Sequence, residues 1–279
     1  MKTSPPLSPG LPDLVHHLTA PCADNGREFT AAERISRIKS LHQRAGHQLS
    51  AELPLALVYR HPQFNPGKPA VLVSSHIDSL YTRYHSRLDG QTFLGTYDNS
   101  ITNAAVAHLI LTGTLHPQVL VAFTGDEERG SRGASQVVEH LSNGNETLRP
   151  ELVVVLDVTE EAYDSHPVSF ENLFAGDGNE GGGAFGMKHR DDLLSFIPSI
   201  PGMEDSHIVP RGEADESWQY ASHDLNCLAL CLPIQTITGN MHDDEGVHAK
   251  LRSLEAYTEI VGLFTNAALG HMGVPPSCG

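Results

Sequence analysis

The stretch Val71-Leu72-Val73-Ser74-Ser75-His76-Ile77-Asp78 decides the fold of this chain. Its first five residues are apolar or small and follow a proline, which is typical of a strand buried on both faces of a sheet. A histidine and a carboxylate come where this strand should end. Because open α/β sheets bind ligands outside the carboxyl ends of their strands, the pair predicts a ligand site at this edge.

Three later apolar runs also lead into acidic or histidine-bearing loops. They are VLVAFTGDEE from Val119, LVVVLDV from Leu152 and LALCLPIQTITGNMH from Leu228. Segments of helical composition lie between them, and strands that alternate with helices imply parallel pairing with right-handed crossovers. The sequence therefore predicts an α/β fold in which a mixed, mostly parallel β-sheet is sandwiched between helices. We expect one domain over residues 1–279.

Other segments give weaker predictions. Residues 81–95 are polar and irregular and predict a loop. The pattern from Thr30 to Glu33 is a capping box, which should begin a helix that ends near Gly46. Cys227 and Cys231 lie four apart in an apolar strand, too far apart to bridge, and we expect them to be buried free thiols.

The composition excludes several classes of partner. The formal net charge is −16, and no basic stripe is visible, so nucleic acid is not expected to bind. No apolar run reaches the roughly 18–20 residues that a bilayer requires, and no apolar stretch follows Lys2 as in a secretory signal. These features predict a cytoplasmic protein with no membrane partner and leave a homo-oligomer open. Most of the 17 histidines must be ordinary surface or core residues.

Two polar groups near the first strand have the chemistry of ligands. His76 and Asp78 share one face of an extended segment, so the carboxylate can accept the second N–H of the imidazole and fix its tautomer for metal binding. An isolated H-x-D pattern is common by chance. Asp98 precedes a helix, where it is either an N-cap or, if Asn99 supplies the cap, a free ligand.

The later runs end in further ligand types. The three carboxylates of Asp126-Glu127-Glu128 repel one another; a solvated loop tolerates this, whereas a bound cation neutralises it and lets a neighbouring carboxylate act as a general base. Asp157 ends a buried run and needs a partner. His242 follows the last run, with His248 as a nearby competitor. Imidazole and carboxylate ligands without thiolates suit zinc, cobalt or manganese, and a bridging Asp between two His-plus-carboxylate halves indicates a two-metal hydrolytic site.

The ordered set HID, YDN, FTGDEERGSRGA, LDV and NMHDDEG resembles the di-zinc exopeptidases, the superfamily of leucyl-type and glutamyl or deblocking aminopeptidases. The resemblance covers Pro69 to Leu269 in ordered pieces. The segment Glu127–Gly133 is similar to the superfamily's E-E-x-G-x-x-G pattern, with Gly130 and Gly133 fixing the register. The segment Arg211–Asp215 and the MH pair resemble the deblocking-aminopeptidase branch.

The resemblance implies a role for each candidate residue. One metal would be held by His76 and Asp157 and the other by Glu128 and His242, with Asp98 bridging both. Glu127 would be the general base, and Asp78 would orient His76. The cofactors would be two divalent metal ions, zinc before cobalt or manganese. The Asp98–Asn99 bond is a candidate cis peptide, and Asp215 a candidate contact for a substrate amine.

The chain also departs from its relatives. The deblocking branch carries an inserted domain between the first His and the bridging Asp, but only 21 residues separate His76 from Asp98 here. We therefore expect a bare catalytic metallopeptidase domain, without the shell-like assemblies that depend on the insertion. The 84 residues between Asp157 and His242 are too few for the lid domain of related deacetylases and carboxypeptidases.

The resemblance thus implies a metal-dependent aminopeptidase that hydrolyses N-terminal residues from a peptide or small amide substrate. One alternative is an amidohydrolase that deacylates N-acyl amino acids with the same metals, although the missing lid argues against it. The other is a non-catalytic binding member of the fold. Such members typically lose ligands, whereas all five are present here.

Overall fold

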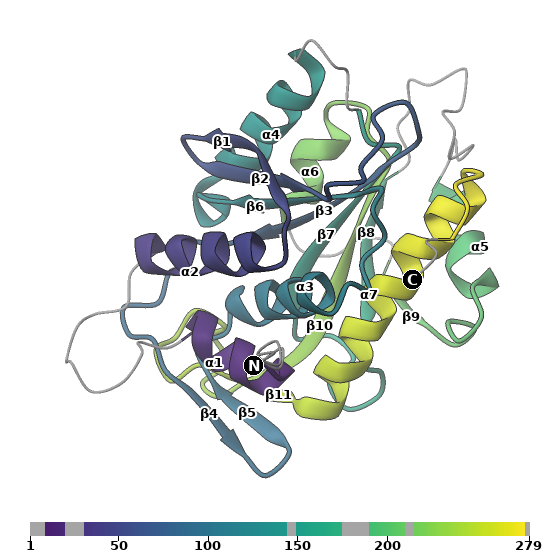
Figure 1. Ribbon diagram of the computed structural model, residues 1–279. Coiled ribbons are helices and arrows are strands. Elements are labelled where there is room, and N and C mark those ends of the chain that lie inside the picture. Colours follow the sequence, from purple (N-terminus) through teal and green to yellow (C-terminus); the bar gives the residue numbers. More distant parts are fainter. Residues whose placement is uncertain (1–8, 20–30, 144–148, 175–189, 210–214, 277–279) are drawn as a thin grey trace, which may run out of the picture.

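The computed structural model describes residues 9–19, 31–143, 149–174, 190–209 and 215–276, and Figure 1 shows its arrangement. In this part of the chain, eleven strands form one mixed sheet. The strands are β1 (Gln48–Leu53), β2 (Ala56–Arg60), β3 (Val71–His76), β4 (Ser86–Asp89), β5 (Thr92–Gly95), β6 (Val119–Thr124), β7 (Leu152–Thr159), β8 (Ser169–Phe174), β9 (His207–Val209), β10 (Cys227–Thr236) and β11 (Val247–Lys250). Their order is β1-β2-β6-β3-β7-β10-β11-β5-β4, and β8 pairs with β10 and β9.

The centre of the sheet is parallel. Strands β6, β3, β7 and β10 lie side by side and run in the same direction. Every residue of β3 and β6 is buried, as the near-continuous apolar runs predict. Because the four strands are parallel, their carboxyl ends meet at one edge of the sheet. This confirms the predicted fold class, with the parallel pairs at the centre and antiparallel strands around them.

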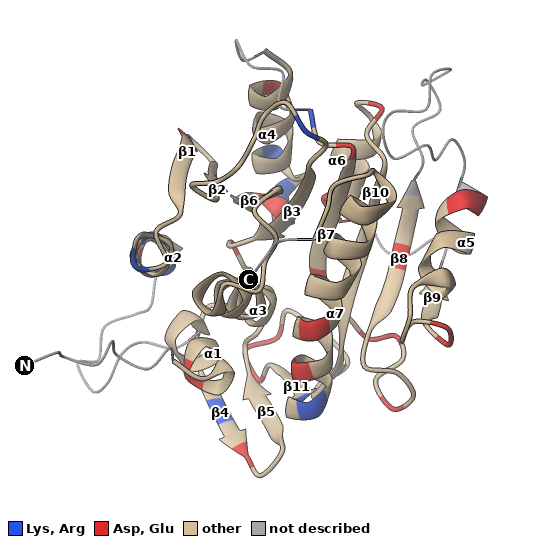
Figure 2. Ribbon diagram, turned by 45° about the vertical axis from the view of Figure 1, so that its right-hand side comes forward, with Lys and Arg blue, Asp and Glu red and all other residues tan. Residues whose placement is uncertain are grey.

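Helices cover both faces of the sheet (Figure 1). One face carries α1 (Leu11–Thr19), α2 (Ala31–Arg44), α3 (Ser100–Thr112), α5 (Arg190–Ser199) and α7 (Leu251–His271), and the other carries α4 (Arg132–Asn143) and α6 (Ser217–Ala221). Figure 2 shows α7 in front of the sheet, where the hydroxyl of Tyr257 donates a 2.9 Å hydrogen bond to the carbonyl of Leu230 in β10.

The two faces bury separate apolar cores. Val71 and Val73 of β3 pack into the larger core under α1, α3 and α7, whereas Leu72 packs into the smaller core under α4 and α6. This alternation is what a strand with two covered faces requires, since successive side chains point to opposite sides. Cys227 and Cys231 of β10 are buried free thiols in the smaller core, as predicted.

Residues 81–95 differ from the prediction. They contain the hairpin of β4 and β5, which turns at Gly90, a residue with a positive φ of 59°. The alternation of half-buried and exposed residues in these short strands is too brief to stand out in the sequence. A further strand, β11, pairs with β5, so the loop that carries His242 does not follow the last strand. Thr30 lies outside the described residues, although α2 begins directly after it.

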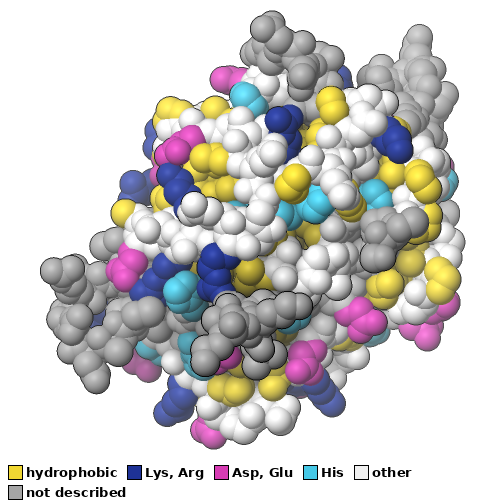
Figure 3. All heavy atoms as spheres, in the orientation of Figure 1, with side chains coloured by type: hydrophobic (Ala, Val, Ile, Leu, Met, Phe, Trp, Pro, Cys, Tyr) yellow, Lys and Arg dark blue, Asp and Glu magenta, His cyan; other side chains and the backbone are white. Residues whose placement is uncertain are grey.

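Basic and acidic side chains lie among one another on one face of the molecule. On the face shown in Figure 3, Lys and Arg side chains are interspersed with acidic ones, so this face presents no basic stripe. Within the described ranges, no helix is both long enough and apolar enough to span a bilayer.

Candidate active site

The carboxyl ends of the central strands carry the predicted site residues. His76 is the last residue of β3, Asp157 lies near the end of β7, and Asp98 directly precedes the N-cap of α3. Glu128 lies in the short 3₁₀ helix η1 (Glu127–Arg129) after β6, and His242 lies in the loop after β10. The structure brings all five predicted ligands and Glu127 to one cavity of about 120 Å³. Its lining is His76, Asp98, Glu127, Glu128, Asp157, Val158, Thr159, Glu171, Asn172, Asp215, Cys231, Met241 and His242.

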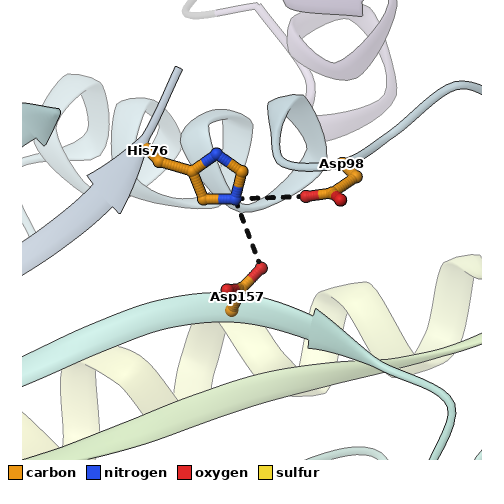
Figure 4. Close-up of side chains that lie close together, drawn as sticks. All are labelled: His76, Asp98 and Asp157. Carbon is orange, nitrogen blue, oxygen red and sulfur yellow. Dashed lines mark ion pairs between the residues drawn. The ribbon is translucent and has the colours of Figure 1, made fainter. Parts of the chain in front are cut away.

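One half of the site is built around His76. Its Nε2 atom lies 3.1 Å from Oδ1 of Asp98 and 3.5 Å from Oδ1 of Asp157 (Figure 4). The other ring nitrogen, Nδ1, lies 3.6 Å from Oδ1 of Asp78, on the side away from the two carboxylates. The imidazole therefore presents one nitrogen to the cavity and the other to Asp78.

The other half is built around His242. Its Nδ1 atom lies 3.5 Å from Oδ2 of Asp98 and 3.5 Å from Oε1 of Glu128. Asp98 thus faces one histidine with each of its two oxygens. Ligand atoms of His76, Asp98 and Asp157 lie within 4.8 Å of one another, and so do those of Asp98, Glu128 and His242. The competitor His248 lies on β11, in register with Gln235 and Leu94, and is in neither group.

The unpartnered atoms of the site fit a metal. Oδ1 of Asp98, Oε1 of Glu128 and Nδ1 of His242 are buried without a hydrogen-bond partner. Buried polar atoms are normally paired, because an unpaired one loses its hydration without compensation. A cation would use the free lone pairs of all three ligand types present. Imidazole and carboxylate groups without thiolates are a donor set that zinc accepts.

The electrostatics of the cavity favour positive charge. Burial, helped by neighbouring carboxylates and opposed by His76, raises the pKa of Glu127 to about 9 and that of Glu128 to about 7. Burial also raises the pKa of Asp157. Burial alone would lower the pKa of His76, but hydrogen bonds and charge from Asp157, together with Asp78 and Asp98, raise it well above its ordinary value. The cluster therefore takes up protons in the absence of another cation.

Asp78 joins the two loops of the site. Its carboxylate accepts hydrogen bonds from the backbone N–H groups of Glu127, at 3.1 Å, and Glu128, at 3.3 Å, while its Oδ1 atom faces His76. Asp126, the third carboxylate of this loop, turns away and pairs with Arg132. The register of the two glutamates therefore places Glu127 and Glu128, and not Asp126, in the cavity.

Gly133 explains why this register is fixed. A Cβ atom at this position would lie 2.6 Å from the backbone N and O atoms of Gly125 and from the carbonyl oxygen of Leu55. Only glycine allows this close approach, because backbone atoms cannot move aside. Gly130, with a φ of 98°, ends η1 in a conformation that also favours glycine.

The side chain of Asn99 contacts a neighbouring strand. The Asp98–Asn99 peptide bond is cis, as the resemblance predicted. However, the side chain of Asn99 makes no capping hydrogen bond to α3 and instead donates to the carbonyl of Leu156 at 2.6 Å. The sequence left open whether Asp98 or the pair Asn99-Ser100 supplies the cap. Asn99 occupies the N-cap position of α3 but makes no capping bond with its side chain, because a neighbouring strand offers its amide a buried acceptor.

Sequence reasoning missed two buried charged residues behind the site. Arg34 of α2 is 1% exposed and donates to the carbonyl of Ile77 at 2.7 Å, which holds the segment after β3. Glu216 is fully buried and accepts hydrogen bonds from the hydroxyls of Ser74 and Thr124. The available signals were the spacing of Arg34 on the apolar face of its helix and the position of Glu216 beside Asp215. Neither signal separates a buried charge from an exposed one.

Comparison with known proteins defines the class. Residues 57–177 match the model of Peptidase family M28. Among solved structures, an aminopeptidase from the archaeon Desulfurococcus kamchatkensis is 11% identical with a TM-score of 0.67, and 96% of this chain and 98% of that chain are covered. The TET1 peptidase of Pyrococcus horikoshii, described as assembling into a tetrahedron or a large octahedral shell, is 12% identical with a TM-score of 0.64, at 92% and 99% coverage. The aminopeptidase PepT of Bacillus cereus is 10% identical with a TM-score of 0.62, at 93% and 97% coverage.

These likenesses establish the fold, and the family match covers the first four predicted ligands. Among curated proteins, none matches the chain significantly. The fold, the peptidase match and the assembled His and carboxylate groups define a peptide-bond hydrolase. The match to Peptidase family M28 and the fold shared with solved aminopeptidases support a place for the chain in the di-zinc exopeptidase superfamily.

Proposed function

We propose that this protein is a metal-dependent aminopeptidase that removes N-terminal residues from peptides. The observation that carries the proposal is the position of Asp98, whose two oxygens face two separate His-plus-carboxylate groups. His76 and Asp157 would hold one divalent ion, Glu128 and His242 the other, and Asp98 would bridge them. We propose zinc as the native ion, with cobalt or manganese as substitutes. Such a pair of cations lowers the pKa of a bound water towards ~7 and polarises a scissile carbonyl.

Glu127 is the proposed general base. It lines the same cavity but belongs to neither ligand group, so its carboxylate is free to move a proton. It would take a proton from the attacking water and return it to the leaving amine. The raised pKa of Glu127, about 9 in the cavity alone, falls when positive charge enters the cavity, because that charge favours the carboxylate form.

Asp78 is the proposed positioning residue for both loops. By accepting from the Glu127 and Glu128 N–H groups and facing Nδ1 of His76, it fixes the base and two ligands relative to one another. A carboxylate behind a ligating histidine also sets the tautomer that leaves Nε2 unprotonated. Hydrogen-bonded carboxylates of this kind keep their charge, and the hydrogen bonds and charge from His76 lower the pKa of Asp78 despite its burial.

One experiment tests the proposal against its alternatives. The purified full chain is analysed for metal content and assayed with aminoacyl amides, peptides and N-acyl amino acids, before and after treatment with a chelator. We expect bound divalent metal, hydrolysis of free-amine substrates only, and loss of activity on chelation. Hydrolysis of N-acyl substrates alone would assign the chain to the amidohydrolases. A protein that holds no metal and cleaves none of the substrates would be a binding module.

A further inference from the structure

The cavity has a second acidic wall, formed by residues other than the predicted ligands and Glu127. This wall contains Glu171 and Asn172 of β8 and Asp215, which precedes α6. Glu171 is 95% buried, since 5% of its surface is exposed, and its Oε1 atom has no hydrogen-bond partner. Burial raises the pKa of Glu171, and hydroxyls of Ser169 and Thr159 offset part of that rise. A buried carboxylate oxygen at the wall of a cavity, with no donor from the protein, can accept a hydrogen bond from a bound ligand.

The charges in the cavity indicate what that partner is. The lining contains six carboxyl groups, and no Lys or Arg occurs among the described residues that form it. Two divalent cations would carry four positive charges, which match the three ligand carboxylates and Glu127. Glu171 and Asp215 would remain without a matching charge. Asp215 accepts hydrogen bonds from the backbone and hydroxyl of Ser217, and neither of its oxygens is among the buried atoms without a partner, whereas Oε1 of Glu171 is. Oε1 of Glu171 is therefore the oxygen left for a cation.

The position of Glu171 indicates which part of a substrate could supply it. Strand β10 separates β8 from β7, because it pairs with both, so the strands of Glu171 and Asp157 lie about 10 Å apart. In an N-terminal residue, the α-amine is two bonds from the scissile carbonyl carbon and must stay close to the ligands. The end of a long side chain can reach the far wall, since a stem of three or four methylenes carries its charge away from the Cα atom.

We propose that Glu171 binds the cationic end of the substrate's first side chain, so that the enzyme prefers peptides that begin with lysine or arginine. This inference rests on the proposed aminopeptidase function and names its substrate class. Glu171 accepts a charge-assisted hydrogen bond from the ammonium or guanidinium group through Oε1. Asp215 adds negative potential from the same wall.

The kinetic test compares matched substrates. Lysyl and norleucyl amides differ only in the terminal amine, and arginyl and glutamyl amides extend the series. We expect the parent enzyme to favour lysyl over norleucyl amide in kcat/KM by about tenfold or more, and Glu171→Gln to remove most of that ratio while retaining norleucyl turnover. Glu161→Gln is the control, because Glu161 is exposed and outside the cavity yet carries the same charge. A ratio near one in the parent enzyme, or a ratio that Glu171→Gln leaves unchanged, overturns the proposal.

A binding test separates this proposal from the proposed function. Calorimetry on the full chain as purified, carrying Glu127→Gln so that the amides are not turned over, compares lysine amide, norleucine amide and Nα-acetyl-lysine amide. Tighter binding of both lysine ligands than of norleucine amide, lost in Glu171→Gln, supports side-chain recognition even if no aminoacyl substrate is cleaved. If lysine and norleucine amides bind equally and only acetylation of the α-amine weakens binding, the acidic wall binds the α-amine, and the proposal is overturned. A thermal melt checks the folding of each variant. If Glu171→Gln does not fold, the ratio of kcat/KM for lysyl over norleucyl amide in the parent enzyme tests the proposed preference.

Discussion

Two buried histidines, His76 and His42, have similar burial and opposite chemistry. Their exposed fractions are 2% and 1%, and both have ring nitrogens without a hydrogen-bond partner. The pKa of His76 is raised well above its ordinary value, although burial opposes this, because Asp157, Asp78 and Asp98 surround it. The pKa of His42 is lowered to about 3, by burial and then by the charge of His47.

The surroundings of His42 explain the difference. Its ring stacks on Tyr59 with centroids 3.8 Å apart and meets the edge of Phe123 at 5.2 Å. Among the described residues, His42 belongs to neither group of possible metal ligands. A buried imidazole among aromatic rings acts as a neutral packing group, whereas a buried imidazole among carboxylates favours a cation. The partners of a histidine, more than its burial, therefore indicate a metal site.

The largest expected effect tests whether the carboxylate region is catalytic. Glu127→Gln keeps the shape of the side chain but cannot accept a proton, so turnover should fall by ~10²–10⁴ while metal content stays the same. Steady-state kinetics and elemental analysis on the same sample measure both. Asp126→Asn is the matched control, since Asp126 is the adjacent carboxylate and pairs with Arg132 outside the cavity. Unchanged turnover in Glu127→Gln would remove its assignment as the base.

The second prediction replaces each of the two histidines, in separate variants, with phenylalanine. His76→Phe should lose at least one bound metal ion per chain, because it removes a ligand nitrogen from the cavity. His42→Phe should keep the full metal content and change the free energy of unfolding by less than about 1.5 kcal/mol, because phenylalanine fills a similar volume among the same rings. Metal analysis and urea unfolding measure the outcome. Equal metal loss in both variants would break the contrast between the two sites.

The third prediction concerns the carboxylate behind His76. Asp78→Asn keeps the side-chain volume but weakens the hold on His76 and on the backbone of η1, so metal affinity or activity should fall about 10–100-fold. A competition titration with a chromophoric chelator measures the affinity. Asp78 faces the ring of His76 but holds Glu128 only through its backbone N–H, so the loss should concern the ion held by His76 more than the other. Wild-type affinity and activity in this variant would show that Asp78 serves only the loop structure.

The site was more predictable from sequence than the edges of the fold. His76, Asp98, Glu128, Asp157 and His242 all follow apolar runs or precede a helix, and parallel strands bring such positions to one edge whatever the details of packing. The register of Glu127 and Glu128 followed from Gly130 and Gly133, because close backbone approach at Gly133 leaves no alternative. Strong local constraints made these predictions robust.

The elements that were missed lack such constraints. Strands β4, β5 and β11 are four residues long and only partly buried, so their alternation does not exceed that of a polar loop. Strand β8, which carries Glu171, is six residues long and its first five residues are buried, but its polar residues Ser169, Glu171 and Asn172 interrupt the apolar run that would mark a buried strand. The hydrogen bond of Asn99 could not be predicted because its acceptor, the carbonyl of Leu156, comes from a strand 57 residues away. Contacts that tertiary structure supplies cannot be seen in a local pattern.

The last prediction uses pH to compare the two histidines. Above pH 6.5, His42 is neutral in the folded and unfolded chains and contributes nothing to the pH dependence. Between pH 6.5 and its folded pKa of about 3, the unfolded chain binds a proton that the folded chain refuses, so stability falls by about 1.4 kcal/mol per pH unit as the pH drops. The variant His42→Phe lacks this term.

The measurement is the difference in the free energy of unfolding between the parent chain and His42→Phe, both without metal. The carboxylate cavity titrates in both proteins and cancels in the difference. We expect the variant to gain on the parent by about 1.4 kcal/mol for each unit between pH 6 and pH 4 in urea titrations. Parallel pH profiles would mean that His42 is charged in the folded protein. In that case a neighbouring group stabilises the imidazolium form of His42, and the contrast with His76 fails.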